Sequence, residues 1–385
     1  MKKALFIHQS SELYGSDKTL LMLIKALNDG SHISPIVVLP NEGRLATILR
    51  ELRIKVIITP VIKLSRGMFK IKNILKIPVE LFQSVRVINK ELKGESIKLV
   101  YSNTLAVLLG GVYAKIRGVP HIWHVHEIIE HPRLVAYAYP ILVNALSRKV
   151  IFNSFAAQNN LCKGHKRLQL KSSVAWNGIN RDQPFTEEEK INDLKRKHQI
   201  NSSAVIIGLV GRISRWKGHE LLLKTFKEIN KSNPYTELIF IGSPPKNQEI
   251  FEEKLKEKIK LWGLSNKCKI IPFQDKIWEI YDMLDVVVVP STEPEPFGLV
   301  ALEGMLSKKP VIASNHGGIV EIIDNNKSGL LFKANDKKDL KRCLMRVLDN
   351  DKLRNQMGIA GKERADKFFT AKAHVAKILN LLNLI

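Results

Sequence analysis

The stretch AVIIGLVGRISRWKGHELLL, residues 204–223, opens with an apolar run, turns at a glycine and continues in a helical pattern. An apolar run without polar alternation predicts a strand covered on both faces, as in a parallel sheet flanked by helices. The same alternation recurs along the chain, and 17–28 is one clear amphipathic helix. The predicted strands are 4–8, 36–39, 55–58, 99–102, 121–125, 149–152, 204–210, 237–242, 285–290 and 310–314. This order predicts an α/β protein with doubly wound sheets.

The length of 385 residues favours two domains, and the polar stretch 177–203 is the best candidate for a boundary. We therefore predict one Rossmann-like domain at 1–177, a linker at 178–203 and a second Rossmann-like domain at 204–367. Sheets of this type bind ligands beyond the carboxyl ends of their strands. If the two domains face each other, those ends line one interdomain cleft.

The chain carries 61 Lys and Arg against 37 Asp and Glu, a net charge of +24. Such an excess favours an anionic partner, although a basic composition can also spread charge over a solvated surface. No apolar run approaches the length of a membrane span. The start, MKKALFIHQS, is typical of a first buried strand and not of a signal peptide. Three widely separated cysteines suit a reducing cytoplasm and argue against disulfides.

The loop GRISRWKG, residues 211–218, follows a predicted central strand and precedes a helix. Gly211 opens the loop, and Arg212 and Lys217 place two cations beside a helix N-terminus. An arginine fork, a lysine point charge and helix-terminal amides together form a diphosphate receptor. The glycine spacing and the Lys-Ser/Thr ending of a Walker loop are absent.

The stretch EPEPFGLVALEGM, residues 293–305, follows the strand that ends near Ser291. Gly298 permits close approach of a ligand, and the amides of Phe297, Gly298 and Leu299 lie at the start of a predicted helix. Carboxylates such as Glu295 and Glu303 accept hydrogen bonds from paired hydroxyls, as in a sugar or ribose. A glutamate at a helix start also stabilises the helix dipole, which is the structural alternative for Glu295.

Two further candidates follow strands in the first half of the chain. Gly15 allows a tight turn after strand 4–8, and Ser16 or Asp17 can cap the next helix, as in any βα turn. In HIWHVHEII, His124 and His126 share one face of a strand. A metal site is disfavoured because further ligands at suitable spacing are missing. One histidine is expected to end the strand as a hydrogen-bonding group, and the other can be a satisfied core residue.

Together these motifs resemble the retaining glycosyltransferases of family 4. EPFGLVALE at 295–303 is similar to the E-x7-E signature, and GRISRWKG at 211–218 to the family's phosphate loop. WNGI at 176–179 and SNHGGIVEII at 314–323 resemble two further segments of that family. The resemblance implies a GT-B fold, a nucleotide-sugar donor and no metal or other cofactor. It also implies that the last helix, within 368–385, packs back on the first domain.

The resemblance assigns a role to each site residue. Glu295 and the amides of 297–299 would hold the donor sugar, and Glu303 the ribose. Arg212 and Lys217 would neutralise the diphosphate leaving group, in place of a metal ion. His126 is similar to the family's histidine near the anomeric carbon, with His124 the less favoured choice. Gly15 and Ser16 resemble the N-terminal glycine-rich loop, although Ser16 replaces its usual second glycine.

A basic segment at 63–98 is the candidate for contact with the acceptor side. It holds nine Lys or Arg (63, 66, 70, 72, 76, 86, 90, 93 and 98) against three acidic residues (80, 91 and 95), with apolar residues interleaved. Such a segment can lie in an anionic membrane interface or pack on its own sheet. We expect a cytoplasmic enzyme, peripheral on the inner face of the membrane, with a glycan or lipid-linked acceptor. Bacterial surface polysaccharide synthesis, of O-antigen, capsule or lipopolysaccharide, is the setting that the family suggests.

Other functions remain open from the sequence alone. Another GT-B enzyme, such as a nucleotide-sugar epimerase or a sucrose- or starch-type synthase, would carry similar motifs. A nucleic-acid-binding protein would account for the charge, but no RNP-like motif or helix-turn-helix is visible, and we expect no nucleic-acid partner. Oligomeric state is not indicated by any pattern in the chain.

Overall fold

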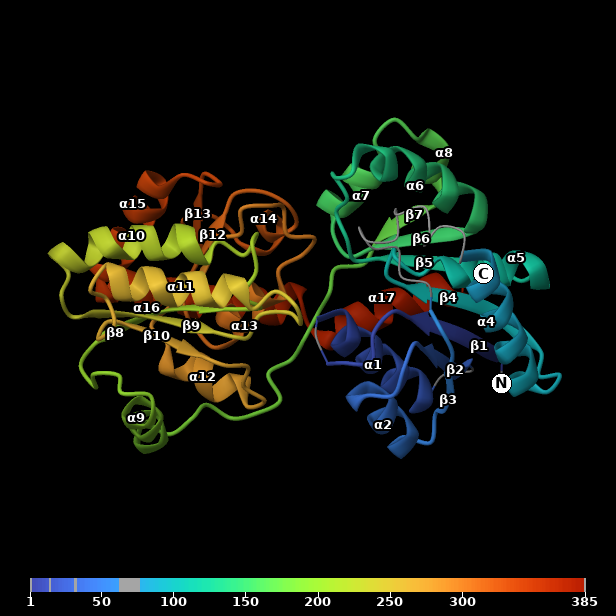
Figure 1. Ribbon diagram of the computed structural model, residues 1–385, viewed down its shortest axis with the longest axis horizontal. Helices are drawn as coiled ribbons and strands as arrows, with labels where there is room; N and C mark the ends of the chain where they lie inside the picture. Colours follow the sequence, from blue (N-terminus) through green and yellow to red (C-terminus); the bar gives the residue numbers. More distant parts are fainter. Residues whose placement is uncertain (1, 14, 31–32, 62–76, 384–385) are drawn as a thin grey trace. The chain divides into compact units, whose positions relative to one another are not determined.

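The computed structural model describes residues 2–13, 15–30, 33–61 and 77–383. The chain forms two compact units, shown in Figure 1. Unit 1 comprises Met1–Gly178 and Ala371–Ile385, and unit 2 comprises Ile179–Thr370. Each unit is built on its own parallel sheet, and each is described separately below.

The sheet of unit 1 has seven parallel strands in the order β3-β2-β1-β4-β5-β6-β7. The strands are β1 Lys2–His8, β2 Ile33–Leu39, β3 Lys55–Ile58, β4 Ile97–Asn103, β5 His121–Val125, β6 Lys149–Phe152 and β7 Ser172–Val174. The burial of β1 and β5 is nearly continuous, as expected for strands covered on both faces. The chain order reverses between β1 and β4, which makes this pair the switch point of the sheet.

The helices of unit 1 cover both faces of its sheet. They are α1 Gly15–Asn28, α2 Arg44–Glu51, α4 Ile77–Leu92, α5 Leu108–Arg117, α6 Arg133–Leu146, α7 Phe155–Cys162, α8 Lys166–Leu170 and α17 Ala371–Asn383. Phe6 and Tyr101 pack in one core with α1, α2 and α17, whereas Leu5 packs with α4 and α5. Trp123 packs with α6, α7 and α8. Because side chains alternate along a strand, α4 to α8 cover the face opposite to α1, α2 and α17.

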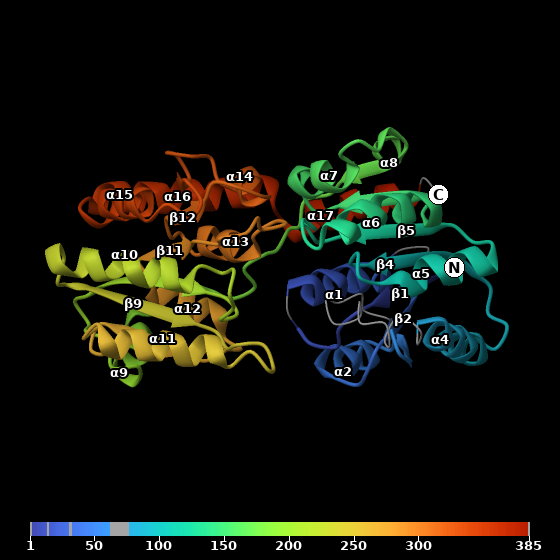
Figure 2. The same ribbon diagram turned by 45° about the horizontal axis from the view of Figure 1, so that its top comes forward.

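Unit 2 has six parallel strands in the order β10-β9-β8-β11-β12-β13. The strands are β8 Val205–Val210, β9 Thr236–Ile241, β10 Cys268–Ile271, β11 Val286–Val289, β12 Val311–Ser314 and β13 Gly329–Phe332. The helices are α9 Glu188–Lys197, α10 His219–Ser232, α11 Ile250–Leu261, α12 Ile277–Met283, α13 Leu299–Leu306, α14 Ile319–Ile322, α15 Lys337–Leu348 and α16 Asp351–Phe368. Figure 2 shows α10 and α11 side by side along β9. The switch point of this sheet lies between β8 and β11.

These two sheets confirm the predicted α/β class with two doubly wound, Rossmann-like units. Every predicted strand is present, with boundaries shifted by a few residues at most. Three strands, β7, β10 and β13, were not predicted, and all three lie at sheet edges. An edge strand is covered less completely, so its sequence lacks the long apolar run that marks a central strand.

The segment 178–203 was predicted as a linker, but in the structure nearly all of it is part of unit 2. Residues from Ile179 onward belong to unit 2, and the segment contains helix α9. Arg181 donates two hydrogen bonds to Asp282, at 2.8 and 2.6 Å, and both side chains are about 5% exposed or less. Thr186 donates its backbone N–H and its hydroxyl to the same carboxylate. This buried network fixes the segment on α12, a contact that a polar local composition does not indicate.

Helix α17 returns to unit 1 at the end of the chain. The Nδ1–H of His374 donates to the Trp176 carbonyl at 2.7 Å. Trp176 lies close to Gly178, where the first segment of unit 1 ends. Ile378 and Leu382 are buried in the core that contains α1. The basic segment at 63–98 is only partly described: residues 63–76 lie outside the described ranges, and 77–98 form α4 and the start of β4.

Candidate functional site

An ion pair joins the loops that follow β8 and β11 in unit 2. Lys217 Nζ lies 2.6 Å from Glu295 Oε1, and the two side chains are 16% and 7% exposed. The Ser291 hydroxyl donates to the same Glu295 oxygen at 2.5 Å. The pair thus lies at the carboxyl ends of the two strands that form the switch point, where ligand sites of such sheets occur.

Backbone geometry fixes the loop that carries Lys217. Gly218 caps α10 with φ 76°, and a Cβ at this position would lie 1.9 Å from the Pro290 carbonyl oxygen. Only glycine accepts both the left-handed conformation and this close approach. Thr292 N–H donates to the Trp216 carbonyl at 2.7 Å, and Lys217 Nζ lies 4.2 Å from the Trp216 ring centroid. The two loops therefore hold the lysine at a defined position.

Gly211 and Arg212 precede this lysine in the same loop. Gly211 follows β8 directly with φ 148°, and the Arg212 side chain is exposed. Arg212 and Lys217 therefore belong to one loop, as predicted, and the buried carboxylate of Glu295 holds Lys217. Nearby, Arg215 forms an exposed ion pair with Glu293, which joins the same two loops.

Helix α13 begins beside the ion pair. Gly298 is its N-cap with φ 114°, and no side chain caps the helix there. The first amides of a helix have no partner within the helix, so the turn at 297–299 presents donors to a ligand. Phe297 is buried, which anchors this turn. The backbone N–H of Gly318 donates to the Glu295 carbonyl at 2.7 Å, so the segment at 314–318 supports the same loop.

Glu303 lies in α13, about a turn beyond Gly298. The hydroxyl of Tyr281 donates to Glu303 Oε2 at 2.8 Å and orients the carboxylate. Tyr281 is fully buried, and burial, followed by the nearby charge of Glu303, holds the pKa of its phenol well above its ordinary value. Tyr281 therefore remains a neutral donor to Glu303 at any physiological pH.

A second cluster lies at the carboxyl ends of β1, β4 and β5 in unit 1. His8 Nε2 lies 2.6 Å from Asp17 Oδ1, and both side chains are almost completely buried. Asn103 Nδ2 lies 3.1 Å from His8 Nδ1, and Asn103 Oδ1 lies 3.1 Å from His126 Nε2. A continuous chain of hydrogen bonds thus runs from Asp17 through His8 and Asn103 to His126.

One set of tautomers satisfies every contact in this chain of hydrogen bonds. If His8 donates from Nε2 to the Asp17 carboxylate, its Nδ1 accepts from the Asn103 amide nitrogen. The Asn103 amide oxygen then accepts from Nε2–H of His126, which leaves His126 Nδ1 as an acceptor. Asp17 and His8 thereby orient His126 through the side chain of Asn103.

The two predicted histidines have different surroundings. His124 is buried in β5, and its Nδ1 lies 2.7 Å from the Tyr101 hydroxyl. The ring centroids of His124 and His126 are 4.0 Å apart, and His374 of α17 lies 6.0 Å from His124. Burial, followed by repulsion from His374 and His8, lowers the pKa of His126 to about 3. Both histidines are therefore neutral at pH 7.

Ser16 and Asp17, the two alternative caps that we predicted, do not precede the first helix. Helix α1 begins at Gly15, so both residues lie inside its first turn, and the Asp17 carboxylate contacts His8, Ser10 and Ser16. The buried bond to His8 is charge-assisted and therefore strong. Gly15 and Ser16 lie at the start of α1, and the Ser16 carbonyl accepts from the Asn103 amide at 3.2 Å.

Sequence reasoning missed His8, Asn103, Tyr101 and His374. His8 and Asn103 are the last residues of β1 and β4, and a polar residue at the end of an apolar run was the available signal. His374 carries no such signal, because its partners are distant in sequence. Within the described ranges, no group of three His, Cys, Asp or Glu side chains is arranged to hold a metal ion.

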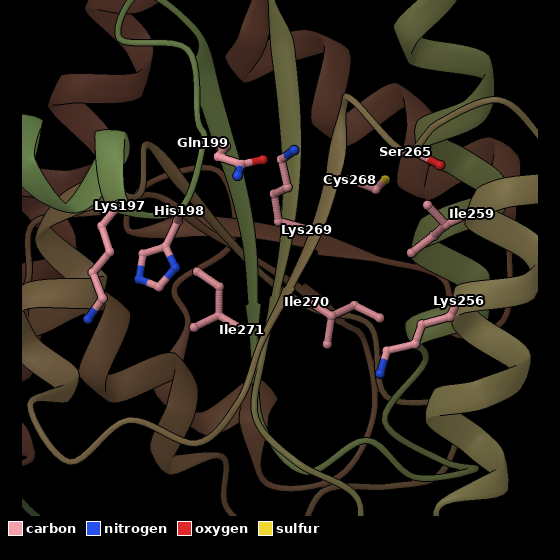
Figure 3. A pocket seen from close by; sticks show the side chains of 10 residues that line it. All are labelled: Lys197, His198, Gln199, Lys256, Ile259, Ser265, Cys268, Lys269, Ile270 and Ile271. Atoms are coloured by element: carbon pink, nitrogen blue, oxygen red, sulfur yellow. The ribbon is translucent and has the colours of Figure 1, made fainter.

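A cavity of about 460 Å³ lies elsewhere in unit 2, along the edge strand β10 (Figure 3). Its walls come from β10 and from the ends of α9 and α11, and none of the predicted site residues lines it. Lys197, Lys256 and Lys269 contribute three cations, but Figure 3 shows their ammonium groups pointing apart. Cations that do not converge make a poor receptor for one phosphate group, so the loops after β8 and β11 remain the candidate site.

Both units of the chain are similar to known proteins. Residues 190–364, nearly all of unit 2, match the family model described as glycosyl transferases group 1. The chain is 31% identical over 172 residues to D-inositol 3-phosphate glycosyltransferase of Corynebacterium diphtheriae, which covers 44% of this chain and 40% of that protein. It is 27% identical over 228 residues to the capsular polysaccharide biosynthesis glycosyltransferase CapM of Staphylococcus aureus, covering 59% and 56%. The chain thus matches about half the length of these two relatives.

Among solved structures, Anabaena Alr3699/HepE in complex with UDP and glucose is similar over 100% of both chains. The TM-score is 0.86 and the sequence identity is 23%. This likeness confirms the predicted GT-B fold, with two α/β units on parallel sheets.

We predict that Lys217 and Glu295 are strongly coupled. In a double-mutant cycle of Lys217→Met and Glu295→Gln, the interaction should contribute about 2 kcal/mol to the free energy of unfolding of unit 2, because each single change leaves a buried charge unpaired. The Arg215–Glu293 pair joins the same loops with side chains 57% and 42% exposed, so its coupling should stay below about 1 kcal/mol. Urea titrations measure both cycles, and equal coupling energies would contradict the assignment.

We predict that acid destabilises unit 1 more than unit 2. Burial lowers the pKa of His121 and His374 to about 4 and that of His126 to about 3, and it holds the pKa of His124 well below 6.5. As pH falls below 6.5 the unfolded chain binds protons that folded unit 1 does not, so the unfolding free energy decreases down to about pH 4. Each such histidine lowers the unfolding free energy by at most about 1.4 kcal/mol for each pH unit in this range.

In unit 2, burial lowers the pKa of His219 to about 3 and that of His198 below its ordinary value. The buried thiols report each unit separately: Cys162 in unit 1, and Cys268 and Cys343 in unit 2. Urea titrations at pH 7, 6 and 5, with a disulfide reagent active in acid, give the exposure of each thiol. The unfolding free energy that Cys162 reports should decrease more steeply with falling pH than the one that Cys268 reports. Equal decreases would show that the histidine cluster is not the cause.

Proposed function

We propose that this chain is a retaining glycosyltransferase that uses a UDP- or GDP-linked sugar as donor. The observation that carries the proposal is the Lys217–Glu295 pair at the switch point of unit 2, with Ser291 and Glu303 on the flanking elements. The match of 190–364 to the glycosyl transferases group 1 model supports it, because that segment contains every one of these residues.

Lys217 and Arg212 would bind the diphosphate of the donor. Charge-assisted hydrogen bonds from a lysine and an arginine stabilise the negative charge that develops on the leaving group, the role that a metal ion has in other enzymes. The amides at the start of α13 would add donors at 297–299. No metal or other cofactor is therefore part of the proposal.

Glu295 and Glu303 would bind hydroxyl groups at the two ends of the donor. Glu295 is fixed by Lys217 and Ser291, so its carboxylate is already oriented for the hydroxyls of the sugar. Glu303 is oriented by Tyr281 and would accept from the ribose hydroxyls. Preorganised carboxylates do not lose rotamer entropy when the donor binds, which favours affinity.

The reaction exchanges one bond at the anomeric carbon for another. The bond to the leaving phosphate breaks, the acceptor oxygen bonds on the same face, and the acceptor proton passes to a phosphate oxygen. His126, kept neutral by burial and oriented by Asn103, would contribute a hydrogen bond near this centre without adding charge. Asp17, His8 and Asn103 would act only through His126, as positioning residues.

A glycan, carried on a lipid diphosphate at the inner face of the cytoplasmic membrane, is the proposed acceptor. Synthesis of a bacterial surface polysaccharide is the proposed setting, and one comparison supports it. CapM of Staphylococcus aureus is a capsular polysaccharide biosynthesis glycosyltransferase. No helix among the described residues is long and apolar enough to cross a bilayer, so contact with such an acceptor would be peripheral.

We predict that one nucleoside diphosphate raises the thermal midpoint of the protein and that Lys217→Ala and Glu303→Ala each weaken its binding. The dissociation constant should rise by about 10- to 100-fold, because a hydrogen bond to a charged group contributes roughly 1.5–3 kcal/mol. Calorimetric titration with UDP, GDP, ADP and dTDP identifies the base.

Lys256→Ala is the matched control, because Lys256 lines the cavity of Figure 3 in the same unit. The proposal requires that this variant bind the nucleotide like the wild type. If Lys256→Ala loses binding while Lys217→Ala keeps it, the nucleotide site lies at β10 and the proposal fails. Absence of binding by every nucleotide would equally overturn it.

A further inference from the structure

Helix α6 presents an apolar face to solvent. Leu134, Tyr137 and Ile141 are 75%, 69% and 51% exposed, and their spacing of three and four residues places them on one side of the helix. Arg133 is the one charged residue in the whole of α6. We call Leu134, Tyr137 and Ile141 the α6 stripe.

The α6 stripe is unusual for a surface helix. The opposite face of α6 already supplies Val135, Tyr139 and Val143 to the core of unit 1, so the stripe is not needed for folding. A surface helix normally carries charged or polar residues opposite its buried face. Isolated exposed apolar side chains are common, but three along a helix with a single charged residue indicate a contact surface.

The charged residues that follow the start of the stripe are basic, whereas Glu130, four residues before Leu134, is an exposed acidic residue. The segment 131–171 contains no Asp or Glu, and its seven cations are Arg133, Arg148, Lys149, Lys163, Lys166, Arg167 and Lys171. Helices α6, α7 and α8 contact one another and lie side by side in Figures 1 and 2. Leu170, at the end of α8, is 88% exposed and adds a further apolar side chain among these cations.

Helices α4 and α5, in the same layer as α6, also expose apolar side chains. Helices α4, α5 and α6 cover one face of the sheet and contact each other in turn. Val79 and Phe82 of α4 are 56% and 68% exposed, and Ile116 of α5 is 62% exposed. The described part of the basic segment at 63–98 therefore lies in the same helix layer as the α6 stripe.

We propose that the α6 stripe, with the cations of 131–171, docks unit 1 on an anionic lipid surface. Apolar side chains that enter the interface and cations that attract acidic headgroups are the two contributions that hold a peripheral protein on a membrane. A second copy of this chain is a poor occupant, since a symmetric contact would bring together two surfaces in which cations outnumber acidic residues.

The position of α6 links this surface to the His126 cluster of unit 1. Helix α6 follows β5 directly in the chain, and Arg133 lies seven residues after His126. The β5–α6 connection therefore joins the α6 stripe to His126. A lipid-linked acceptor held at the stripe would place its glycan near this connection. This link rests on the proposed function, whereas lipid binding itself does not.

The test is sedimentation of the full chain with vesicles of phosphatidylcholine containing about 30% phosphatidylglycerol. We expect wild type to bind these vesicles and to bind pure phosphatidylcholine at least tenfold more weakly, because the cations contribute roughly 1 kcal/mol each near an anionic surface. The double variant Leu134→Glu/Ile141→Glu should bind the anionic vesicles at least tenfold more weakly than wild type. Leu134→Ser/Ile141→Ser should also weaken binding, without adding negative charge.

The matched control is Tyr235→Glu/Leu261→Glu in unit 2, whose native side chains are 74% and 79% exposed. This variant changes the net charge equally and should bind vesicles like wild type. Equal loss in both double variants would reduce the effect to net charge and overturn the proposal. No vesicle binding by wild type would also overturn it.

A second measurement reports contact at the stripe itself. All three cysteines are buried, so a Tyr137→Cys variant can be labelled selectively with an environment-sensitive fluorophore. The fluorescence should rise on addition of anionic vesicles, and the same label at Tyr235→Cys should not respond. A change at position 137 that depends on protein concentration without vesicles would assign the stripe to self-association and contradict the proposal. Nucleoside diphosphate binding in all variants tests the donor site separately.

Discussion

The ion pair between Lys217 and Glu295 is the interaction on which the candidate site depends. It joins the loops after β8 and β11, the two strands at which the sheet of unit 2 reverses its order. A lysine and a glutamate this far from water are stable only as a pair, so each fixes the position of the other. Gly218, Ser291 and Trp216 constrain the same loops, and a ligand with both anionic and hydroxyl groups matches the two charges that they hold.

The central strands of both sheets were predictable because they are buried on both faces, and runs of β-branched residues such as VVVV at 286–289 favour such strands. The edge strands β7, β10 and β13 were not, since one of their sides has no neighbour and their sequences are short and mixed. The segment 178–203 was misjudged for a related reason. Its composition is polar, but the buried Arg181–Asp282 bond, between residues 101 positions apart, attaches it to unit 2.

The sequence placed the candidate residues at strand ends but did not show their partners. The positions of Lys217, Glu295, Glu303 and His126 followed from strand–loop–helix patterns and from the family resemblance. The contacts that orient them, from Tyr281, Asn103 and His8, join elements far apart in the chain and have no local signal. The α6 stripe is a similar case, because an apolar helix in a sequence reads as core until its exposure is known.

We propose that the site in unit 2 activates a nucleotide sugar for transfer with retention. Proton NMR of the nucleotide sugar, incubated with the protein without acceptor, tests it most directly, because slow hydrolysis releases the sugar before its anomers equilibrate. We predict release with the anomeric configuration of the donor, and loss of this release in Lys217→Ala. Release of the opposite anomer, or an unchanged rate in Lys217→Ala, would contradict the account.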